Sequence, residues 1–170
     1  NCLLPPAFRA DLLRFCALWS EGGVYVDGDI EMIVPFSQVY SECHAITMGY
    51  DYGNGPRHTQ SAMQMKILSS TPGSQTAYCM MQSIVENVRR RVRVSRNYPS
   101  RITGPMLLYS CMKRTSEKIA VSYADTKFSQ WPYTGLIGKW RNKIRIVAYE
   151  KPKDDDFIEN KHVDSTYYNN

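Results

Sequence analysis

The sequence predicts one α/β domain over residues 1–170. Segments with apolar residues at steps of three and four alternate with short apolar runs bounded by glycine and proline, which is the pattern of helices interleaved with strands. A chain of 170 residues with 43% hydrophobic and 12% aromatic residues is able to bury a core. No repeat, low-complexity segment or linker divides the sequence, so we expect a single globular unit.

The composition also limits the possible membrane segments and ligands of the chain. It has no apolar run of the ~20 residues that a bilayer span needs, and residues 1–7 lack the basic and apolar parts of a signal peptide. We therefore expect any membrane anchor to lie outside this chain. The net charge of +5 permits an anionic ligand and does not require nucleic acid.

The cysteines are scattered along the chain with no close pair, which argues against a zinc cluster or a redox motif. The sequence leaves open whether one or two disulfide bonds form. Cys16 and Cys79 fall in helical patterns, so we expect both to be buried as small hydrophobic side chains.

The best-defined segment is residues 8–31, which reads as a helix, a turn and a strand. Pro5 and Pro6 suit the first helical turn, where a missing N–H costs nothing, and Gly22-Gly23 ends the helix. The expected inward face of this helix has apolar side chains at steps of three and four, namely Phe8, Leu12, Phe15, Cys16 and Trp19.

The strand that follows brings two carboxylates together. The two-residue period of a strand puts Tyr25, Asp27 and Asp29 on one face. Carboxylates on either side of Gly28 suit a hard divalent cation, Mg²⁺ or Mn²⁺, that also holds phosphate oxygens. A tight hairpin turn at Asp27-Gly28 explains the same residues, and from these residues alone both interpretations stay open.

Three short motifs in this order resemble a known family. An Ala-Asp-x-x-Arg helix segment at residues 10–14, a Gly-Gly-x-Tyr turn at 22–25 and an Asp-x-Asp strand at 27–29 are similar to the sugar-binding region of glycosyltransferase family 32. Relatives in this family include fungal Golgi α-mannosyltransferases. The resemblance implies the nucleotide-sugar transferase fold called GT-A, a mixed sheet flanked by helices. Compared with that fold, the chain is expected to lack the N-terminal strand and helix that bind the nucleotide.

The resemblance also implies roles for site residues. Asp29 is expected to bind the metal, and Asp27 to hold the ribose or sugar and to share the metal through water. Tyr25 is expected to brace the donor. Asp11 and Arg14 match family positions that grip the hydroxyls of the donor sugar, although their spacing of three residues on a helix equally suits a mutual ion pair.

Two glycines extend the implied site as cofactor-binding residues. Gly23 belongs to the Gly-Gly-x-Tyr turn, and Gly104 belongs to Thr103-Gly104-Pro105. Family members carry Thr-Gly-Pro near the reaction centre, where a helix N-terminus faces phosphate. From the residues alone, capping of the next helix by Thr103 is the better explanation of this motif.

The C-terminal tail contributes one further candidate. Family members carry a histidine shortly before a Ser-Trp pair that closes over the donor, and His162 is a candidate metal ligand or donor contact by that resemblance. Solvent exposure is the alternative for a histidine in a polar tail. The sequence departs from the family here, because Ser165 is followed by Thr166 and Tyr167.

The rest of the chain divides into elements by the same patterns. We expect strands at residues 45–50, 119–122 and 144–149, and helices at 60–69, 74–92 and 106–117. We expect a turn or short helix at 36–40, a break at 71–73, and loops at 51–57 and 128–133.

By this resemblance, the chain is a metal-dependent, retaining glycosyltransferase that moves a hexose from a nucleoside diphosphate sugar to a glycan or glycolipid acceptor. Mannosyl or galactosyl transfer is expected, with Mn²⁺ or Mg²⁺ stabilising the departing diphosphate and no side-chain nucleophile. The lumen of the Golgi is the expected location in a eukaryote. No nucleic-acid partner is expected.

Two alternatives come from other features. Exposed arginines would suit a module that binds nucleic acid or anionic lipid, although such charge runs are usually solvated surfaces. These arginines are Arg89, Arg90, Arg91, Arg93 and Arg96. The other alternative is a degenerate transferase that keeps the fold without turnover, because the tail and the N-terminal part depart from the family pattern.

Overall fold

The computed structural model describes residues 6–38, 44–51, 62–92, 99–127, 134–140 and 143–150. Its helices are α1 (Pro6–Ser20), α2 (Gln75–Arg89) and α3 (Pro105–Arg114), with short 3-10 turns η1 (Phe36–Gln38) and η2 (Pro99–Arg101). Its strands are β1 (Gly23–Val26), β2 (Ile30–Met32), β3 (Ile46–Asp51), β4 (Ala62–Ser70), β5 (Ile119–Lys127), β6 (Thr134–Trp140) and β7 (Lys143–Glu150).

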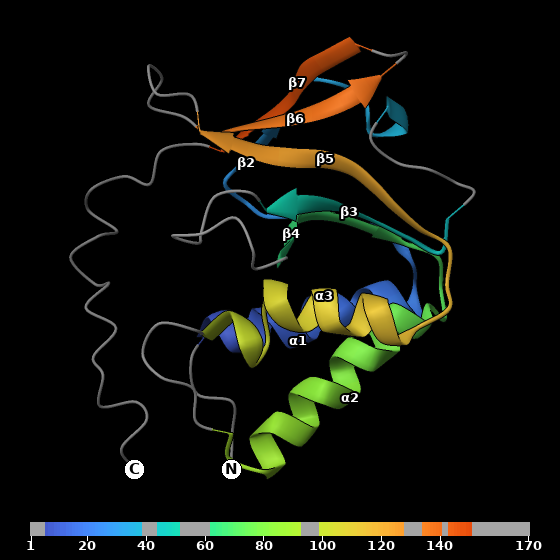
Figure 1. Cartoon of the computed structure of the whole chain (residues 1–170), viewed down its shortest axis with the longest axis vertical. Helices are drawn as coiled ribbons and strands as arrows, with labels where there is room; N and C mark the ends of the chain where they lie inside the picture. The colour runs from blue at the N-terminus through green and yellow to red at the C-terminus, as the bar shows by residue number, and fades with distance from the viewer. Residues whose placement is uncertain are drawn as a thin grey trace, which may run out of the picture.

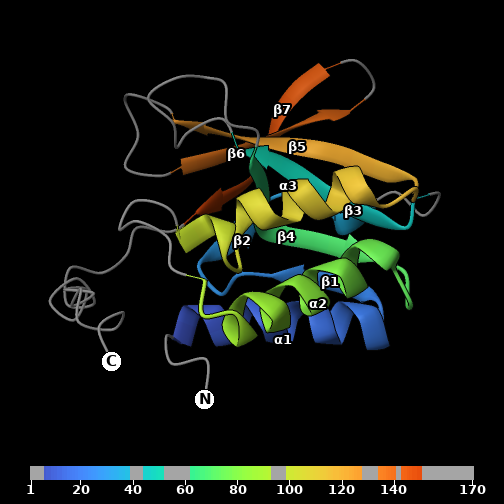
Figure 2. The same ribbon diagram turned by 60° about the horizontal axis from the view of Figure 1, so that its bottom comes forward.

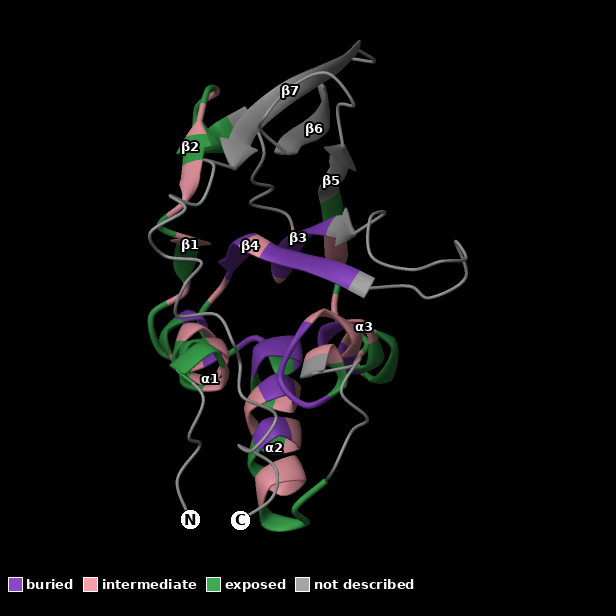
Figure 3. Cartoon of the chain, turned by 90° about the vertical axis from the view of Figure 1, so that its left-hand side faces the viewer, coloured by how far each residue is buried: buried purple, intermediate pink, exposed green. Residues whose placement is uncertain are grey.

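The strands form one mixed sheet in the order β1-β4-β3-β5-β6-β7-β2. The pair β3–β5 is parallel, and the other described pairs are antiparallel. Strands β1 and β2 stand at opposite ends of this order, yet residues 27–29 alone connect them. The sheet therefore curves so that its two ends meet at that turn, on one side of the molecule (Figure 3).

The helices gather on one side of β3 and β4, and β5, β6 and β7 lie beyond these strands (Figure 1). Helices α1 and α2 pack against each other, as do α2 and α3, to form a layer (Figure 2). Among the described residues, no helix has the length and apolar character to cross a bilayer.

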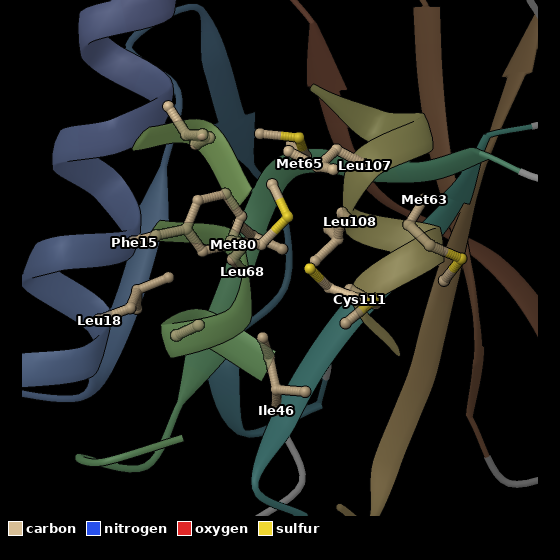
Figure 4. Close-up of a cluster of buried hydrophobic side chains, with 13 residues drawn as sticks. Phe15, Leu18, Ile46, Met63, Met65, Leu68, Met80, Leu107, Leu108 and Cys111 are labelled. Atoms are coloured by element: carbon tan, nitrogen blue, oxygen red, sulfur yellow. The ribbon is translucent and has the colours of Figure 1, made fainter. Parts of the chain in front are cut away.

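The main core lies between this helical layer and the sheet (Figure 4). Its buried side chains come from all three helices and from β3 and β4, and include Phe15, Leu18, Ile46, Met63, Met65, Leu68, Met80, Leu107 and Leu108. A second, smaller cluster forms where Ile67 packs against Val26, Ile30, Met32 and Val34. Each fully buried side chain of this size stabilises the fold by about 1.5–3 kcal/mol, so these two clusters fix α1 and the turn after β1 in place.

The predicted helix at residues 60–69 is wrong, because residues 62–70 form strand β4. This strand pairs with β1 on one side and β3 on the other. Met63 and Met65 pack in the main core, and Ile67 packs in the second cluster. The sequence of β4 alternates apolar and polar residues from Met63 to Ile67, as a strand does, but apolar residues also recur there at steps of three and four, as on a helix. Both periods fit so short a segment, and only pairing with the neighbouring strands decides between them.

Helix α1 confirms the predicted helix and its end. Gly22 has a positive φ of +68°, and a Cβ there would lie 2.6 Å from the Pro72 side chain, so only glycine fits this turn. The prediction of its inward face is partly wrong, because Trp19 is 41% exposed and Leu18 is buried instead. The centroid of the Trp19 ring lies 5.8 Å from that of the Tyr78 ring. The position of the sheet, which the period of a single helix does not reveal, decides which apolar stripe is covered.

A disulfide joins Cys79 of α2 to Cys111 of α3, with 5.7 Å between their Cα atoms. The sequence allowed a disulfide bond but favoured a free, buried thiol at Cys79. The prediction of a free thiol at Cys79 is wrong. Cys16 is half-buried and free. The bond cross-links α2 to α3, and sequence spacing could not predict it because 32 residues separate the partners.

The other elements mostly confirm their predictions. η1, β3, α2, α3, β5 and β7 lie where a turn, strands and helices are expected. Strand β6 was not predicted, because Gly135 and Gly138 make its sequence read as a turn. The predicted loop at 128–133 and most of the loop at 51–57 lie outside the described residues; Asp51 itself ends β3.

Candidate functional site

Arg14 is the centre of a polar cluster where α1 meets β1 and β4. Its Nη2 lies 3.2 Å from Asp11 Oδ1, and its Nη1 lies 3.4 Å from Asp27 Oδ1. Nη1 also donates a 2.8 Å hydrogen bond to the carbonyl of Met65. The guanidinium carbon lies 4.5 Å from the centre of the Tyr25 ring. One buried cation therefore connects a helix, two strands and two carboxylates.

Tyr25 and Asp27 meet on the predicted face of β1. The Tyr25 hydroxyl donates a 2.7 Å hydrogen bond to Asp27 Oδ1, which is the expected contact between residues two apart on a strand end. The Asp27 amide donates to the carbonyl of Lys66 at 2.8 Å, so β4 also fixes the backbone at this point.

Thr103 joins the cluster from the turn before α3. Its hydroxyl donates a 2.7 Å hydrogen bond to Asp11 Oδ2. The prediction that Thr103 caps α3 is wrong, because Gly104 is the N-cap residue and makes no side-chain cap bond. Sequence analysis missed this role, because a contact across 92 residues leaves no local pattern. We name Asp11, Arg14, Tyr25, Asp27 and Thr103 the arginine cluster.

Burial sets the protonation of the cluster. It raises the pKa of Asp11 above its ordinary value, against the opposing hydrogen bond from Thr103 and the charge of Arg14. Burial also raises the pKa of Asp27, against the hydrogen bond from Tyr25 and the charge of Arg14. Burial and the hydrogen bond to Asp27 raise the pKa of Tyr25 to about 12. The two carboxylates therefore depend on their partners to stay ionised.

The Arg14 side chain is only 9% exposed, and its Nε–H is buried without a hydrogen-bond acceptor in the part of the chain that the structure describes. An unpaired buried donor costs free energy. Asp11 and Arg14 form the ion pair that their spacing suggests, while their contact with a donor sugar stays a prediction.

Asp27 and Asp29 flank a tight turn between β1 and β2, in which the Ile30 amide donates to the Asp27 carbonyl at 3.1 Å. The hairpin interpretation is wrong, because β1 pairs with β4 and β2 pairs with β7. Asp29 is half-buried, and its charge contributes to the raised pKa of Asp27. The two carboxylates thus share one electrostatic environment.

This donor set fits a hard divalent cation. Tyr25 and Arg14 both contact Oδ1 of Asp27, and carboxylate oxygens are the ligands that Mg²⁺ and Mn²⁺ prefer. Within the described ranges, no three metal-binding side chains converge, as is common for cations that are held by one or two carboxylates together with substrate phosphates. His162, the third predicted ligand, lies outside the described residues.

Part of this site lies in a segment that matches a known protein family. Residues 3–46 match the family model of the glycosyltransferase sugar-binding region containing a DXD motif. The sugar-binding region thus contains four members of the arginine cluster together with Asp29, and Thr103 lies beyond it. This confirms the DXD-type sugar-binding region that the sequence predicts, while family 32 itself stays a prediction.

A solved structure, "PaToxG Glycosyltransferase", is similar in fold, with a TM-score of 0.50 and 18% sequence identity. The likeness covers 64% of this chain and 35% of that one, so the chain spans about a third of its length. The mixed α/β fold is therefore glycosyltransferase-like in part. No curated protein matches the chain.

The two predicted glycines lie next to residues of the arginine cluster, and their local geometry differs. Gly23 opens β1 with a φ of +89°, and a Cβ there would meet nothing within 4 Å. Gly104 follows Thr103 directly, and a Cβ there would lie 3.0 Å from Ser100 Cα. Gly23 therefore serves the turn conformation, whereas Gly104 permits a close approach of the backbone.

The alternative basic patch is only partly described. Arg89, Arg90 and Arg91 are exposed at the end of α2, and Arg90 pairs with Glu86. Arg93 and Arg96 lie outside the described residues. The binding of nucleic acid or anionic lipid by this patch stays untested.

Proposed function

We propose that this chain is the donor-binding part of a metal-dependent glycosyltransferase, which transfers a hexose with retention from a nucleoside diphosphate sugar to a glycan or glycolipid. The convergence of Asp11, Arg14, Tyr25 and Asp27 inside the matched sugar-binding region carries this proposal. Mannosyl or galactosyl transfer, the acceptor class and membership of family 32 belong to the same proposal.

The residues of the chain have distinct tasks in this proposal. Arg14 keeps Asp11 and Asp27 ionised by its charge and fixes their orientation. Asp11 and the guanidinium of Arg14 bind hydroxyl groups of the donor sugar. Tyr25 holds Asp27 through its hydroxyl and shields Arg14 from water with its ring.

Asp29 and Asp27 are the proposed metal ligands, with His162 as a third candidate. A bound Mn²⁺ or Mg²⁺ supplies positive charge opposite the diphosphate that departs from the sugar. The described residues include no arrangement that we assign as a side-chain nucleophile, which is compatible with transfer on one face of the donor.

The test is Asp29→Asn in the full protein, assayed by thermal shift and turnover with UDP-glucose, UDP-galactose, UDP-N-acetylglucosamine and GDP-mannose, with and without Mn²⁺. We expect the wild type to be stabilised by one donor in the presence of Mn²⁺. The variant should lose about 100-fold or more in transfer, because it lacks a ligand charge at the site of developing charge. Its circular dichroism spectrum should be unchanged.

Glu21→Gln is the control, because Glu21 is exposed and its carboxylate contacts its neighbour Ser20. This variant should keep full activity. Retention of more than a few per cent of transfer by Asp29→Asn would refute the metal assignment. A panel with no donor response for the wild type would refute transferase function and favour the degenerate transferase.

We also propose that the chain folds in an oxidising compartment, such as the Golgi lumen of a eukaryote. The disulfide between Cys79 and Cys111 supports this location, because such bonds persist mainly in oxidising compartments. Alkylation of free thiols before and after reduction, followed by mass spectrometry of cellular protein, tests the proposal. Two protected cysteines at these positions are expected, and alkylation of both without reduction would contradict it.

A further inference from the structure

The hydroxyl of Thr103 is the feature of the arginine cluster that the proposed function does not use. Thr103 is 1% exposed, and its O–H reaches Asp11 Oδ2 at 2.7 Å while Arg14 approaches the other oxygen of the same carboxylate at 3.2 Å. A carboxylate accepts about four hydrogen bonds through its two oxygens. Two partners on opposite oxygens therefore fix its plane and leave acceptor capacity for a ligand.

The backbone around Thr103 is itself firmly held. The Asn87 side chain donates a 2.9 Å hydrogen bond to the carbonyl of Ile102, which anchors the segment to α2. Gly104 lies so close to η2 that a Cβ would come within 3.0 Å of Ser100 Cα. The Leu107 and Leu108 amides of α3 donate to the Gly104 carbonyl. The hydroxyl therefore comes from a rigid support that is independent of α1.

We propose that Thr103 is a positioning residue that orients the Asp11 carboxylate toward the hydroxyl groups of the donor sugar. This inference rests on the proposed function. The ion pair with Arg14 links two residues of one helix, and it leaves the carboxylate free to rotate about Cβ–Cγ. The bond from Thr103 is the described contact that fixes the carboxylate from a different element. It selects one rotation and thereby the direction of the remaining lone pairs.

The experiment compares Thr103→Val, Thr103→Ser and Thr76→Val in the full protein. Valine keeps the shape of threonine and removes the hydroxyl group, whereas serine keeps the hydroxyl group. Thr76 is the matched control, since it is equally buried and its hydroxyl contacts Thr115 rather than Asp11. All three should fold, as judged by circular dichroism.

We expect Thr103→Val to raise the KM for the nucleotide sugar by about 10-fold or more, the loss that one hydrogen bond to a charged group gives. Binding of the free nucleoside diphosphate with Mn²⁺ should stay within twofold. Thr103→Ser should restore the KM, and Thr76→Val should lose thermal stability without a change in KM. A KM within twofold of wild type for Thr103→Val, or an equal rise for Thr76→Val, would overturn the proposal.

A second readout separates this inference from the proposed function. The ionisation of Asp11, followed by carboxyl ¹³C NMR, should move to higher pH in Thr103→Val and not in Thr76→Val, because the hydroxyl favours the charged carboxylate beside Arg14 and Asp27. If the wild type binds no nucleotide sugar, transferase function fails and this shift still tests the contact. An unchanged titration would overturn the role of Thr103 whatever the chain binds.

Discussion

Carboxylates lie among polar groups both in the arginine cluster and beside the first turn of α2, but their pKa values shift in opposite directions. At α2, Glu117 accepts hydrogen bonds from the Thr76 amide at 2.8 Å, from the Ser74 hydroxyl at 3.0 Å and from the Gln75 amide. Burial acts to raise the pKa of Glu117, but these hydrogen bonds together lower it below its ordinary value. In the arginine cluster, burial prevails, and the pKa values of Asp11 and Asp27 are raised.

The two regions differ in how the fold satisfies their charged and polar groups. The free N–H groups of a helix start satisfy Glu117 within the fold, and the helix gains a cap. Asp11 and Asp27 share one cation, and the Nε–H of that cation has no acceptor in the described part of the chain. Buried side-chain atoms without a hydrogen-bond partner also occur at Thr47 and Ser69, but among the three such atoms of the described residues only the one of Arg14 belongs to a charged group.

The largest expected effect breaks the arginine cluster with Arg14→Met. Removing the shared cation leaves two partly buried carboxylates without the opposite charge that Arg14 places beside them, so we expect a loss of about 3 kcal/mol in the free energy of unfolding at pH 7. Acids with a raised folded-state pKa bind protons more readily when folded, so the deficit should shrink as pH falls below neutral. Urea unfolding at several pH values measures this.

Arg9→Met is the control for Arg14→Met, because Arg9 is exposed on the same helix. It should change the free energy of unfolding by no more than about 0.5 kcal/mol. A deficit of Arg14→Met that grows toward acid pH would contradict the account given for the cluster.

Glu117→Gln should have the opposite pH dependence. We expect a loss of about 1 kcal/mol at pH 7, the usual size of a capping interaction. Because the folded-state pKa of Glu117 lies below the ordinary value of 4.5, its stabilisation is present at neutral pH and is lost as pH falls through the folded-state pKa. The variant and the wild type should therefore converge in acid, which thermal unfolding at pH 7 and near pH 3 would show. A difference that persists at the lower pH would count against a charged cap.

A third expected effect, about as large as that of Glu117→Gln, sharpens the comparison inside the arginine cluster. Tyr25→Phe keeps the ring over Arg14 and removes the hydroxyl that donates to Asp27, so we expect a loss of about 1 kcal/mol in stability. Tyr78→Phe is the control, since its hydroxyl contacts Gln82 on the surface. Equal losses in the free energy of unfolding of the two variants, measured by urea unfolding, would show that the contact with Asp27 stabilises the fold no more than a surface contact does.

Local sequence predicted much of the fold and four of the five residues of the arginine cluster. The ends of α1, the carboxyl pair after β1 and the starts of α2 and α3 follow from short-range rules about glycine, proline and periodicity. The helix predicted at 60–69 is wrong because the apolar residues of this short segment fit a helical period as well as a strand period. Strand β6 was missed because its two internal glycines weaken the strand pattern. The proximity of Asp11, Arg14, Tyr25 and Asp27 agrees with the motif order.

The sequence alone determined which side chains stand near one another within a single helix or strand, because helical and strand periods are fixed by backbone geometry. It thereby placed Asp11 beside Arg14 and Tyr25 beside Asp27. Tertiary structure decided that these two pairs share one cation, that Thr103 serves Asp11 instead of a helix end, and that Cys79 bonds to Cys111. Such contacts join residues far apart along the chain, and their energies depend on burial, which arises only when the layers pack together.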